Sequence, residues 1–467
     1  MIMKKTIGIA LVGALAALGA GCGDDETNGG GTGGVGGVGG GDGGCVIEIT
    51  AEEISADETW DRTDCDYVLT RITYVVGATL TIAPGVTVKG DAGSALVITS
   101  TGEIDAQGTS TDPIVMTSSR AEGARLTGDW GGLAMLGKAI LSWGGADCDG
   151  TGDCTATLEG LPSGENRAEY GGDDDTHNCG TLRYVRIEYA GNEIAPNNEL
   201  NGLTLGGCGS GSTIEYVQIH RGLDDALEIF GGAVNAQYIL MSGMGDDGLD
   251  WDQGYRGTVM NFIVHHFAGS SADPRGIEAD NNSENNLVTP RSQPTVMYGT
   301  LVADAGAKHD QGIVLRRGTW GDLDGMVVEG FSSAGVDIRD GSWDASDGAT
   351  MPSRSGGWPT ELSVEGSCFF GNSPNYPVDS DPCTGTDADD DCNDESELTA
   401  DSYFAENTEM ADAARNNREE DPEVGDYSAA ATGGTPNYQV GNANCMGGYA
   451  TPSGEVVWTD GWTAFPL

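Results

Sequence analysis

The chain has 467 residues, and its 73 acidic side chains against 22 basic ones give a formal net charge of −51. A protein of that charge repels nucleic acid and anionic lipid headgroups, which excludes nucleic acid as a partner. Hydrophobic residues make up 38% of the sequence and include nine tryptophans, which excludes a fully disordered chain.

The N-terminus has the composition of an export signal. Lys4 and Lys5 precede the apolar run IGIALVGALAALGAG (7–21). This run is too short to span a bilayer and is typical of the hydrophobic region of a secretory signal. We therefore expect residues 1–21 to be a signal peptide that is removed on export.

The stretch LGAGC (18–22) resembles the lipobox of bacterial lipoproteins, although Gly19 stands where leucine is usual. The resemblance implies that Cys22 is lipidated and anchors the protein to a membrane, as in an exported bacterial lipoprotein of the outer membrane or cell surface. Ordinary cleavage and release of a soluble protein is the alternative. We expect residues 22–44 to comprise this cysteine and a flexible glycine-rich linker.

The eleven cysteines agree with export. Without Cys22, ten remain, and an even number is typical of disulfides made in an oxidising compartment. Zinc is disfavoured as their ligand because the sequence has no C-x-x-C and only five histidines. Sequence alone does not choose among the many possible pairings; the candidates are Cys148–Cys154, Cys383–Cys392, Cys45–Cys65, Cys179–Cys208 and Cys368–Cys445.

An internal repeat organises the middle of the chain. Each copy consists of a small or polar residue, an aliphatic residue, a variable residue, an apolar residue and a turn, and a second short strand lies between copies. Two or three short strands per coil are typical of an all-β, right-handed parallel β-helix, a solenoid. A β-sandwich is the alternative, but its strands would not repeat the same pattern. The six copies are NGLTLGG (201–207), DALEIFGG (225–232), DGLDWDQG (247–254), RGIEADNN (275–282), QGIVLRRG (311–318) and AGVDIRDG (334–341).

The repeat also predicts which residues fill the core. Coils of a parallel β-helix stack about 4.8 Å apart, so that equivalent positions form columns along the axis. Two columns of apolar residues are expected to point inward. One contains Leu203, Leu227, Leu249, Ile277, Ile313 and Val336, and the other contains Leu205, Ile229, Trp251, Ala279, Leu315 and Ile338.

Three further motifs lie outside the repeat, TLTIAPGV (79–86), DWGGL (129–133) and WTDGW (458–462), and a fourth, GDDGLDWDQGYRG (245–257), contains its third copy. With them the chain resembles exported bacterial right-handed β-helix lipoproteins of the pectate-lyase-like superfamily. The resemblance implies the fold and says little about function. We expect the β-helix over residues 45–394. Residues 395–467 are expected to form a C-terminal cap with a short helix, because 395–417 has helix-forming composition.

Acidic residues occupy outward positions of the same repeat. Glu228, Asp250 and Glu278 share one column, and Asp252 and Asp280 share another, which continues with Arg316 and Arg339. Two charges about 5 Å apart repel by about 3 kcal/mol at an effective dielectric constant of 20, so such a column needs water, a raised pKa or a bound cation. We predict Ca²⁺, a cation that prefers oxygen ligands. The predicted ligands are Glu228, Asp246, Asp250, Asp252, Glu278 and Asp280. In the alternative interpretation Asp224, Asp225, Asp246 and Asp247 form turns in which their side chains bond the local backbone, and the column acids extend into solvent.

A catalytic alternative follows from a partial likeness to polysaccharide hydrolases of this fold, whose GDD-type turn supplies acids. It implies roles for Asp225, Asp247 and Asp250, and a lyase would add Ca²⁺ and an arginine base, for which Arg256 or Arg275 is nearest. The hydrolases' Gly-His-Gly and Arg-x-Lys are missing here. The sequence therefore favours a surface-exposed binding, adhesion or scaffold lipoprotein without chemistry of its own, whose partner is an extracellular polysaccharide or a surface protein. A Ca²⁺-dependent polysaccharide lyase or glycoside hydrolase is the alternative.

Overall fold

The structure is a computed structural model, and its described residues belong to one compact unit, Val38–Leu467. Among these residues, no helix is long and apolar enough to cross a membrane. Several predictions fall outside them: the signal peptide, Cys22, Cys148, Arg339, Cys383, Cys392 and residues 395–409 and 411–414. The described residues are 44–143, 154–162, 164–195, 198–268, 274–283, 286, 288–306, 311–338, 362–376, 410, 415–448 and 457–467.

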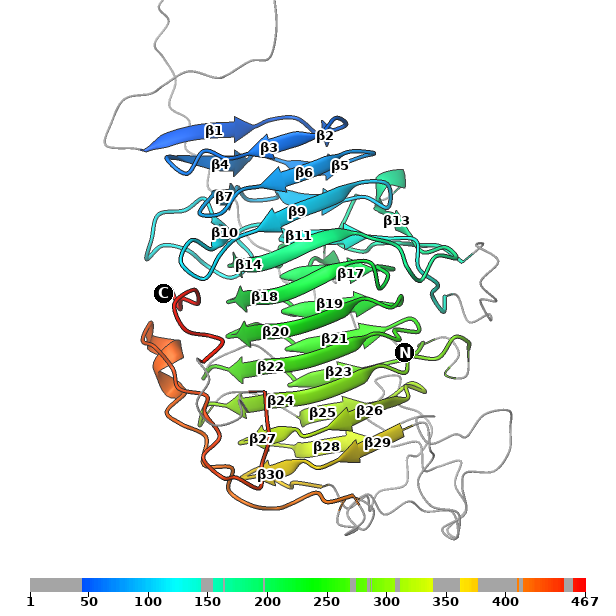
Figure 1. Ribbon diagram of the computed structural model, residues 1–467, viewed down its shortest axis with the longest axis vertical. Coiled ribbons are helices and arrows are strands. Elements are labelled where there is room, and N and C mark those ends of the chain that lie inside the picture. The colour runs from blue at the N-terminus through cyan, green and yellow to red at the C-terminus, as the bar shows by residue number, and fades with distance from the viewer. Residues whose placement is uncertain are drawn as a thin grey trace, which may run out of the picture. The chain divides into compact units, whose positions relative to one another are not determined.

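Parallel strands stacked in coils form a right-handed parallel β-helix, as predicted (Figure 1). The chain passes from a strand of one sheet to a strand of the other, and successive coils pair in parallel. The 10-stranded sheet contains, in spatial order, β2 (Glu53–Ile54), β5 (Ile72–Val75), β8 (Ala95–Ile98), β11 (Leu133–Leu136), β17 (Leu203–Gly206), β19 (Leu227–Phe230), β21 (Leu249–Asp252), β23 (Ile277–Ala279), β25 (Gln311–Leu315) and β28 (Ala334–Ile338).

The 16-stranded sheet has one long path and several branches. Its path is β1 (Cys45–Ile49), β4 (Cys65–Leu69), β7 (Thr87–Gly90), β10 (Ile114–Ser118), β14 (Gly180–Glu188), β18 (Thr213–His220), β20 (Asn235–Ser242), β22 (Thr258–His266), β24 (Thr295–Ala303), β26 (Gly321–Asp324) and β29 (Leu362–Glu365). Its branches are β3 (Glu58–Trp60), β6 (Thr79–Ile82), β9 (Glu103–Gln107), β27 (Val327–Glu329) and β30 (Cys368–Phe370).

The long strands of the 16-stranded sheet bend in the middle. Tyr184, Tyr216 and Tyr238 lie at this bend in β14, β18 and β20, with φ angles of 50°, 54° and 59°. A positive φ is uncommon for a residue other than glycine, and here it turns the strand from one side of the coil to the next. The two halves of β24 accordingly pair with different strands, β26 and β27. Each such coil therefore contributes three short straight segments, within the predicted two or three.

The predicted core is confirmed. Leu203, Leu227 and Leu249 are in register on β17, β19 and β21, and the column continues through Ile277 and Ile313 to Val336. The second predicted column, from Leu205 through Trp251 to Ile338, is in register in the same strands. The residues of both columns are buried and belong to one continuous hydrophobic cluster. Burial of these side chains is the main stabilising contribution to the stack.

An insertion covers part of the outer face of the 10-stranded sheet. It includes the short antiparallel pair β12 (Ala156–Thr157) and β13 (Glu169–Tyr170), and the 3-10 turn η1 (Asn166–Ala168). Tyr170 packs against Phe230 of β19, with ring centroids 6.0 Å apart, and its hydroxyl donates to Gln253 Oε1 at 2.9 Å. A second short antiparallel pair, β15 (Glu193–Ala195) and β16 (Asn198–Glu199), lies between β14 and β17 in the sequence.

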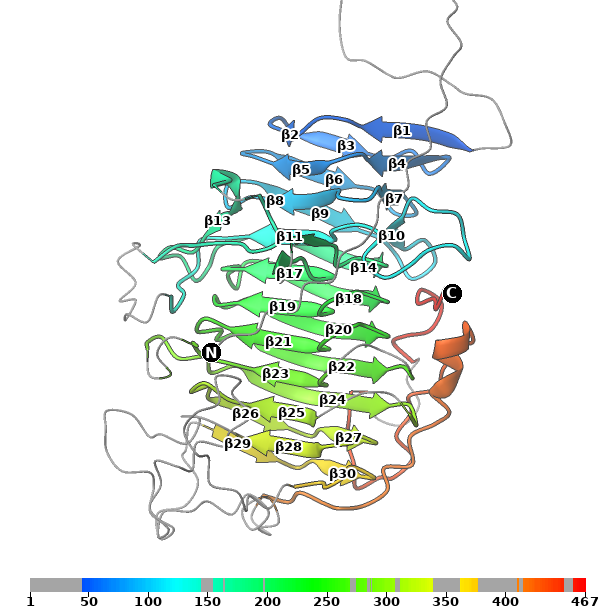
Figure 2. The same cartoon turned by 180° about the vertical axis from the view of Figure 1, so that it is seen from behind.

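The C-terminal segment, residues 415–448 and 457–467, lies beside the 16-stranded sheet and passes successive coils in both views (Figures 1 and 2). It includes the 3-10 turn η3 (Ser428–Thr432). The ring of Trp462 meets the rings of Tyr184 and Tyr216 edge-on. Gln218 Nε2 donates to the carbonyl of Ala464 at 2.6 Å, and Gln218 Oε1 accepts the backbone N–H of Ala464 at 2.9 Å. The segment therefore covers the outer face of several coils.

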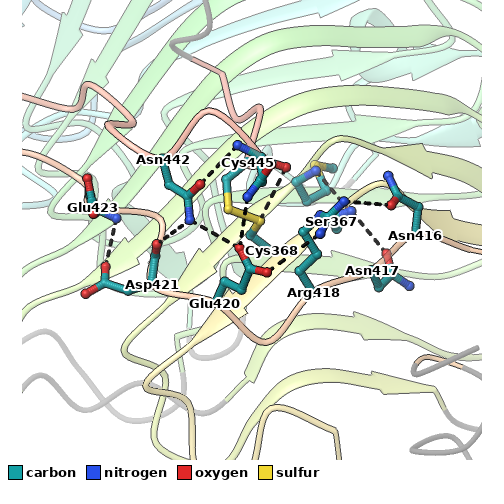
Figure 3. Close-up of a disulfide and its surroundings, with 12 residues drawn as sticks. Ser367, Cys368, Asn416, Asn417, Arg418, Glu420, Asp421, Glu423, Asn442 and Cys445 are labelled. Atoms are coloured by element: carbon teal, nitrogen blue, oxygen red, sulfur yellow. Dashed lines mark hydrogen bonds and ion pairs between the residues drawn. A yellow bond between two sulfur atoms is a disulfide. The ribbon is translucent and has the colours of Figure 1, made fainter. Parts of the chain in front are cut away.

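Three predicted disulfides are present in the described residues: Cys45–Cys65, Cys179–Cys208 and Cys368–Cys445. Cys154 is also disulfide-bonded. The Cys368–Cys445 bond joins β30 to the C-terminal segment, beside a network of asparagine and acidic side chains (Figure 3). Disulfides form and persist in oxidising environments, which indicates an exported protein.

Candidate metal centre

An acidic cluster lies on the outer face of the 10-stranded sheet, across β19, β21 and β23. Glu228 pairs in register with Asp250, and Asp250 with Glu278, as the repeat predicts. Their sequence neighbours point into the core, and successive residues of a strand point to opposite faces, so these three side chains point outward. The rigid stack of coils thus fixes the spacing of the carboxylates.

The turns before these strands add a second row. Asp225 Oδ1 accepts the backbone N–H of Asp247 at 2.8 Å, and Asp247 Oδ1 accepts the backbone N–H of Arg275 at 2.5 Å. Each aspartate therefore holds the turn of the next coil. Part of the alternative interpretation is thereby realised, because these two residues form local backbone contacts in turns.

The acids are buried, although they point outward. Asp225 and Glu228 are each 7% exposed and Asp247 is 2% exposed, and Glu278 and Asp280 are also buried. Asp246, Asp250 and Asp252 are half-buried. The interpretation in which the column acids extend freely into solvent is therefore wrong. The stacked carboxylates shield one another, and Tyr170 of the insertion packs beside β19.

Three overlapping groups of carboxylates are close enough to hold a metal ion. In each group one oxygen per residue lies within 4.8 Å of the others. Two oxygens that bind Ca²⁺ at about 2.4 Å are at most about 4.8 Å apart, so the spacing suits a single Ca²⁺ per group. The groups are Asp224–Asp225–Asp246, Asp225–Glu228–Asp250 and Asp247–Asp250–Glu278.

Arginines neutralise one end of the cluster. Arg275 pairs with Glu278 at 2.7 Å, and Arg316 pairs with Glu278 at 2.8 Å and with Asp280 at 2.9 Å. Arg317 pairs with Asp280 at 2.8 Å. Arg316 was predicted to follow the acidic column, whereas the ion pairs of Arg275 and Arg317 were not.

The other end has no such partner. Among the described residues, no basic side chain forms an ion pair with Asp225, Glu228 or Asp250. Asn201 Nδ2 donates to Glu228 Oε2. Asp250 Oδ1 is buried and accepts no hydrogen bond from the part of the chain that the structure describes. An anionic oxygen in that position needs a proton or a cation.

The pKa values of the carboxylates agree with this need for a proton or a cation. Burial is the main cause that raises the pKa values of Asp225, Glu228, Asp247 and Asp250 well above their usual range, and repulsion from neighbouring carboxylates adds to it. Burial and the charge of Asp280 raise the pKa of Asp252 to about 8. Without a cation, these carboxylates therefore hold protons more strongly than free carboxylates do.

The structure brings together some of the predicted catalytic residues and not others. Asp225, Asp247 and Asp250 lie in the cluster. Arg256 follows the C-terminal end of β21, where its guanidinium pairs with Asp175 at 2.9 Å and donates to the Gly254 carbonyl. Its hydrogen bonds and ion pairs do not involve the three acids.

Sequence reasoning missed Asn201 as a member of the site. Asn201 is the first residue of the repeat copy NGLTLGG, and Asp225 and Asp247 are the first residues of the next two copies. The first column of the alignment was therefore the signal that could have identified it. Arg275 begins the fourth copy, and it lies beside Asp247 and Glu278.

A family comparison agrees with the fold and with the position of the site. The family described as pectate-lyase like beta helix domain matches residues 52–352, which include every strand of the cluster. No curated protein and no solved structure matches the chain. Because the matched residues make up more than half of the sequence, the chain belongs to the pectate-lyase-like β-helix family.

Proposed function

We propose that the protein is an exported surface protein that binds or scaffolds extracellular partners through a calcium-associated β-helix, without chemistry of its own. In the same proposal, Cys22 carries a lipid and the glycine-rich linker holds the β-helix near a membrane. An extracellular polysaccharide or a surface protein is the partner. A folded stack on a flexible tether suits such a role, because the tether leaves the stack free to reorient.

The acidic cluster is the observation that carries the proposal. Asp225, Glu228 and Asp247 are at most 7% exposed, and a catalytic acid must touch its substrate. The arginines beside the cluster, Arg275 and Arg316, are bound in ion pairs with the acids themselves. This arrangement favours a structural role for the acids, as ligands of a stabilising cation, over a catalytic role on a polysaccharide.

The donor set fits calcium. All the candidate ligands are carboxylate oxygens of Asp or Glu, which Ca²⁺ prefers, and none of the three groups includes histidine or cysteine. The buried Asp250 Oδ1 is left without a hydrogen bond from any described residue, and a bound ion supplies the missing partner. Glu228, Asp246, Asp250, Asp252, Glu278 and Asp280 remain the predicted set of ligands.

A Ca²⁺-dependent polysaccharide lyase or glycoside hydrolase is the second candidate. The family match favours it. So does Asp252, which is half-buried and whose pKa is raised to about 8, a value that suits a general acid near neutral pH. In this alternative Asp225, Asp247 and Asp250 are the further candidates.

One pair of assays separates the two candidates. The purified protein is incubated with polygalacturonate, alginate and neutral polysaccharides in the presence of calcium, and the products are followed by ultraviolet absorbance for lyase cleavage and by reducing ends for hydrolysis. Binding to the same polymers is measured in parallel by co-sedimentation. The proposal expects no cleavage above that of a heat-denatured sample. Cleavage that is lost in Asp252→Asn would establish the enzyme instead.

A further inference from the structure

The two ends of the acidic cluster differ in how their charge is balanced. At the β23 end, Glu278 contacts both Arg275 and Arg316 at 2.7 and 2.8 Å. At the β19 end, neither Asp225 nor Glu228 has an arginine or lysine partner among the described residues. Asp250 lies between the two ends, because it belongs both to the Asp225–Glu228–Asp250 group and to the Asp247–Asp250–Glu278 group.

A buried amide lies beside the unbalanced end. Asn201 is 3% exposed, and its Nδ2 donates to Glu228 Oε2. Its Oδ1 is buried and accepts no hydrogen bond from the residues that the structure describes. A buried amide oxygen without a donor is costly in free energy. Nδ2 and Oδ1 belong to the same amide group, so the contact with Glu228 places this oxygen beside that carboxylate.

We infer that one divalent cation of the calcium class binds at the β19 end, to Asp225, Glu228, Asp250 and the Oδ1 of Asn201, and that Arg275 and Arg316 take the place of a second cation at the β23 end. This inference rests on the calcium association proposed above and adds its location, its ligands and its stoichiometry. Of the six ligands predicted from the sequence, it keeps Glu228 and Asp250. It adds Asp225 and Asn201 as new ligands.

Coordination chemistry supports a single ion at this end. Three carboxylates and one amide supply at least four oxygens, and Ca²⁺ completes its six to eight ligands with second carboxylate oxygens or water. Asp250 is half-buried and gives the site a side open to solvent. At the other end, the guanidinium groups already contact Glu278 and Asp280, so a second ion there would have to displace them.

The experiment uses the full chain, freed of metal by a chelator and titrated with CaCl₂ in a calorimeter, with metal analysis of the dialysed protein as a second measurement. One ion per chain is expected. Asp250→Asn preserves the shape of the side chain and removes one charged ligand, so it should weaken binding at least about tenfold. Asp337→Asn is the matched control. Asp337 is buried in the same outward column, three coils beyond Asp250, and its variant should bind calcium as the parent does.

Two substitutions of Asn201 should change calcium affinity in opposite directions. Asn201→Ala removes the neutral ligand and should weaken binding about tenfold. Asn201→Asp keeps an oxygen in place, loses the donor to Glu228 and adds a charge that repels Glu228 unless a cation lies between the two carboxylates, so it should bind calcium more tightly than the parent. If Asn201→Ala does not fold, the Asp variant still decides the matter. Circular dichroism without calcium shows whether each variant is folded.

The outcomes separate this inference from the proposed function. Two or more ions per chain, unchanged binding in Asp250→Asn, or binding by Asn201→Asp no tighter than by the parent would overturn the ligand assignment while calcium association stands. Equal weakening in Asp337→Asn would also overturn it. If no calcium binds at all, the calcium association fails together with the site. Polysaccharide cleavage would overturn only the non-catalytic role.

Discussion

The carboxylate of Asp225 accepts the backbone N–H of Asp247 from the next coil, at 2.8 Å. Asp247 repeats the contact with Arg275 one coil further on. A side chain that takes part in the backbone hydrogen bonds of a turn holds that turn in place, so these aspartates fix the position of the carboxylates around them. Asp225 therefore belongs both to the hydrogen bonds that fix the turns and to the proposed cation site.

Asp250→Asn should stabilise the calcium-free protein, because the parent must either protonate this buried carboxylate, whose pKa is raised by burial, or leave it charged beside Glu278 and Glu228, and the neutral amide removes both costs. The same change should destabilise the protein in excess calcium relative to the parent, since a ligand is lost. Urea unfolding followed by circular dichroism, with and without chelator, measures both effects. The same sign of change under both conditions would contradict the assigned role of Asp250.

Leu249, one residue earlier, is the matched position on the inward face. Leu249→Ala should lower the free energy of unfolding by about 2–5 kcal/mol, because a fully buried leucine leaves a cavity in the stack. The loss should be independent of calcium. Equal tolerance of alanine at Leu249 and at Asp250 would contradict the register of β21.

Leu249 and Asp250 also show how much of the fold and of the site could be predicted from the sequence. The inward ladders were predictable because one residue type recurs at the same position of every copy, and only a buried column imposes that constraint. The outward column of Glu228, Asp250 and Glu278 was placed correctly for the same reason. The burial of these acids was not predictable, because it depends on crowding between coils. The packing of Tyr170 on Phe230 of β19 was not predictable either, because an insertion brings Tyr170 from outside the repeat.

The path of the C-terminal segment could likewise not be predicted from the sequence. Its WTDGW motif is not part of the repeat, so no register relates it to a coil. Trp462 packs against Tyr184 and Tyr216, more than two hundred residues earlier. Periodicity predicts contacts between neighbouring coils, whereas a contact between an aromatic side chain and a distant face has no periodic signal.

Stability of the calcium-free protein should fall as the pH rises from about 4 to about 8. Asp252 has an ordinary pKa of 3.8 and a pKa of about 8 in the folded protein. The folded state therefore keeps a proton that the unfolded chain releases, and this stabilising contribution is present below the lower value and lost as the pH passes through the higher one. Melting temperatures across this range measure it. Asp252→Asn is the control, and its curve should be flatter; a parallel curve would contradict the assignment.

The Cys368–Cys445 disulfide should stabilise the protein more than Cys45–Cys65. The two bonds close loops with sequence separations of 77 and 20 residues, and the loss of loop entropy in the unfolded chain grows with loop length. Replacing both cysteines of a pair by alanine should lower the free energy of unfolding by about 4 kcal/mol for the longer loop and about 3 kcal/mol for the shorter one. Unfolding curves under non-reducing conditions give both values, and the reverse order would contradict the expectation.

Cys22→Ala should move the protein from the membrane fraction to the soluble exported fraction, because a lipid on Cys22 is the proposed anchor. Mass spectrometry of the native N-terminus should show the acyl chains. Cys45→Ala, which removes only a disulfide, should leave the protein in the membrane fraction. An unmodified mature N-terminus at any residue other than Cys22 would exclude the anchor.

The melting temperature with and without calcium is the most direct test of the central claim that a divalent cation completes the cluster. A ligand that binds only the folded state stabilises it by about 2.7 kcal/mol at a hundredfold excess over Kd. We predict that the melting temperature rises with added CaCl₂, falls with chelator, and responds much less in Asp250→Asn. A melting temperature unaffected by calcium and chelator would show that protons and the arginines alone balance the cluster.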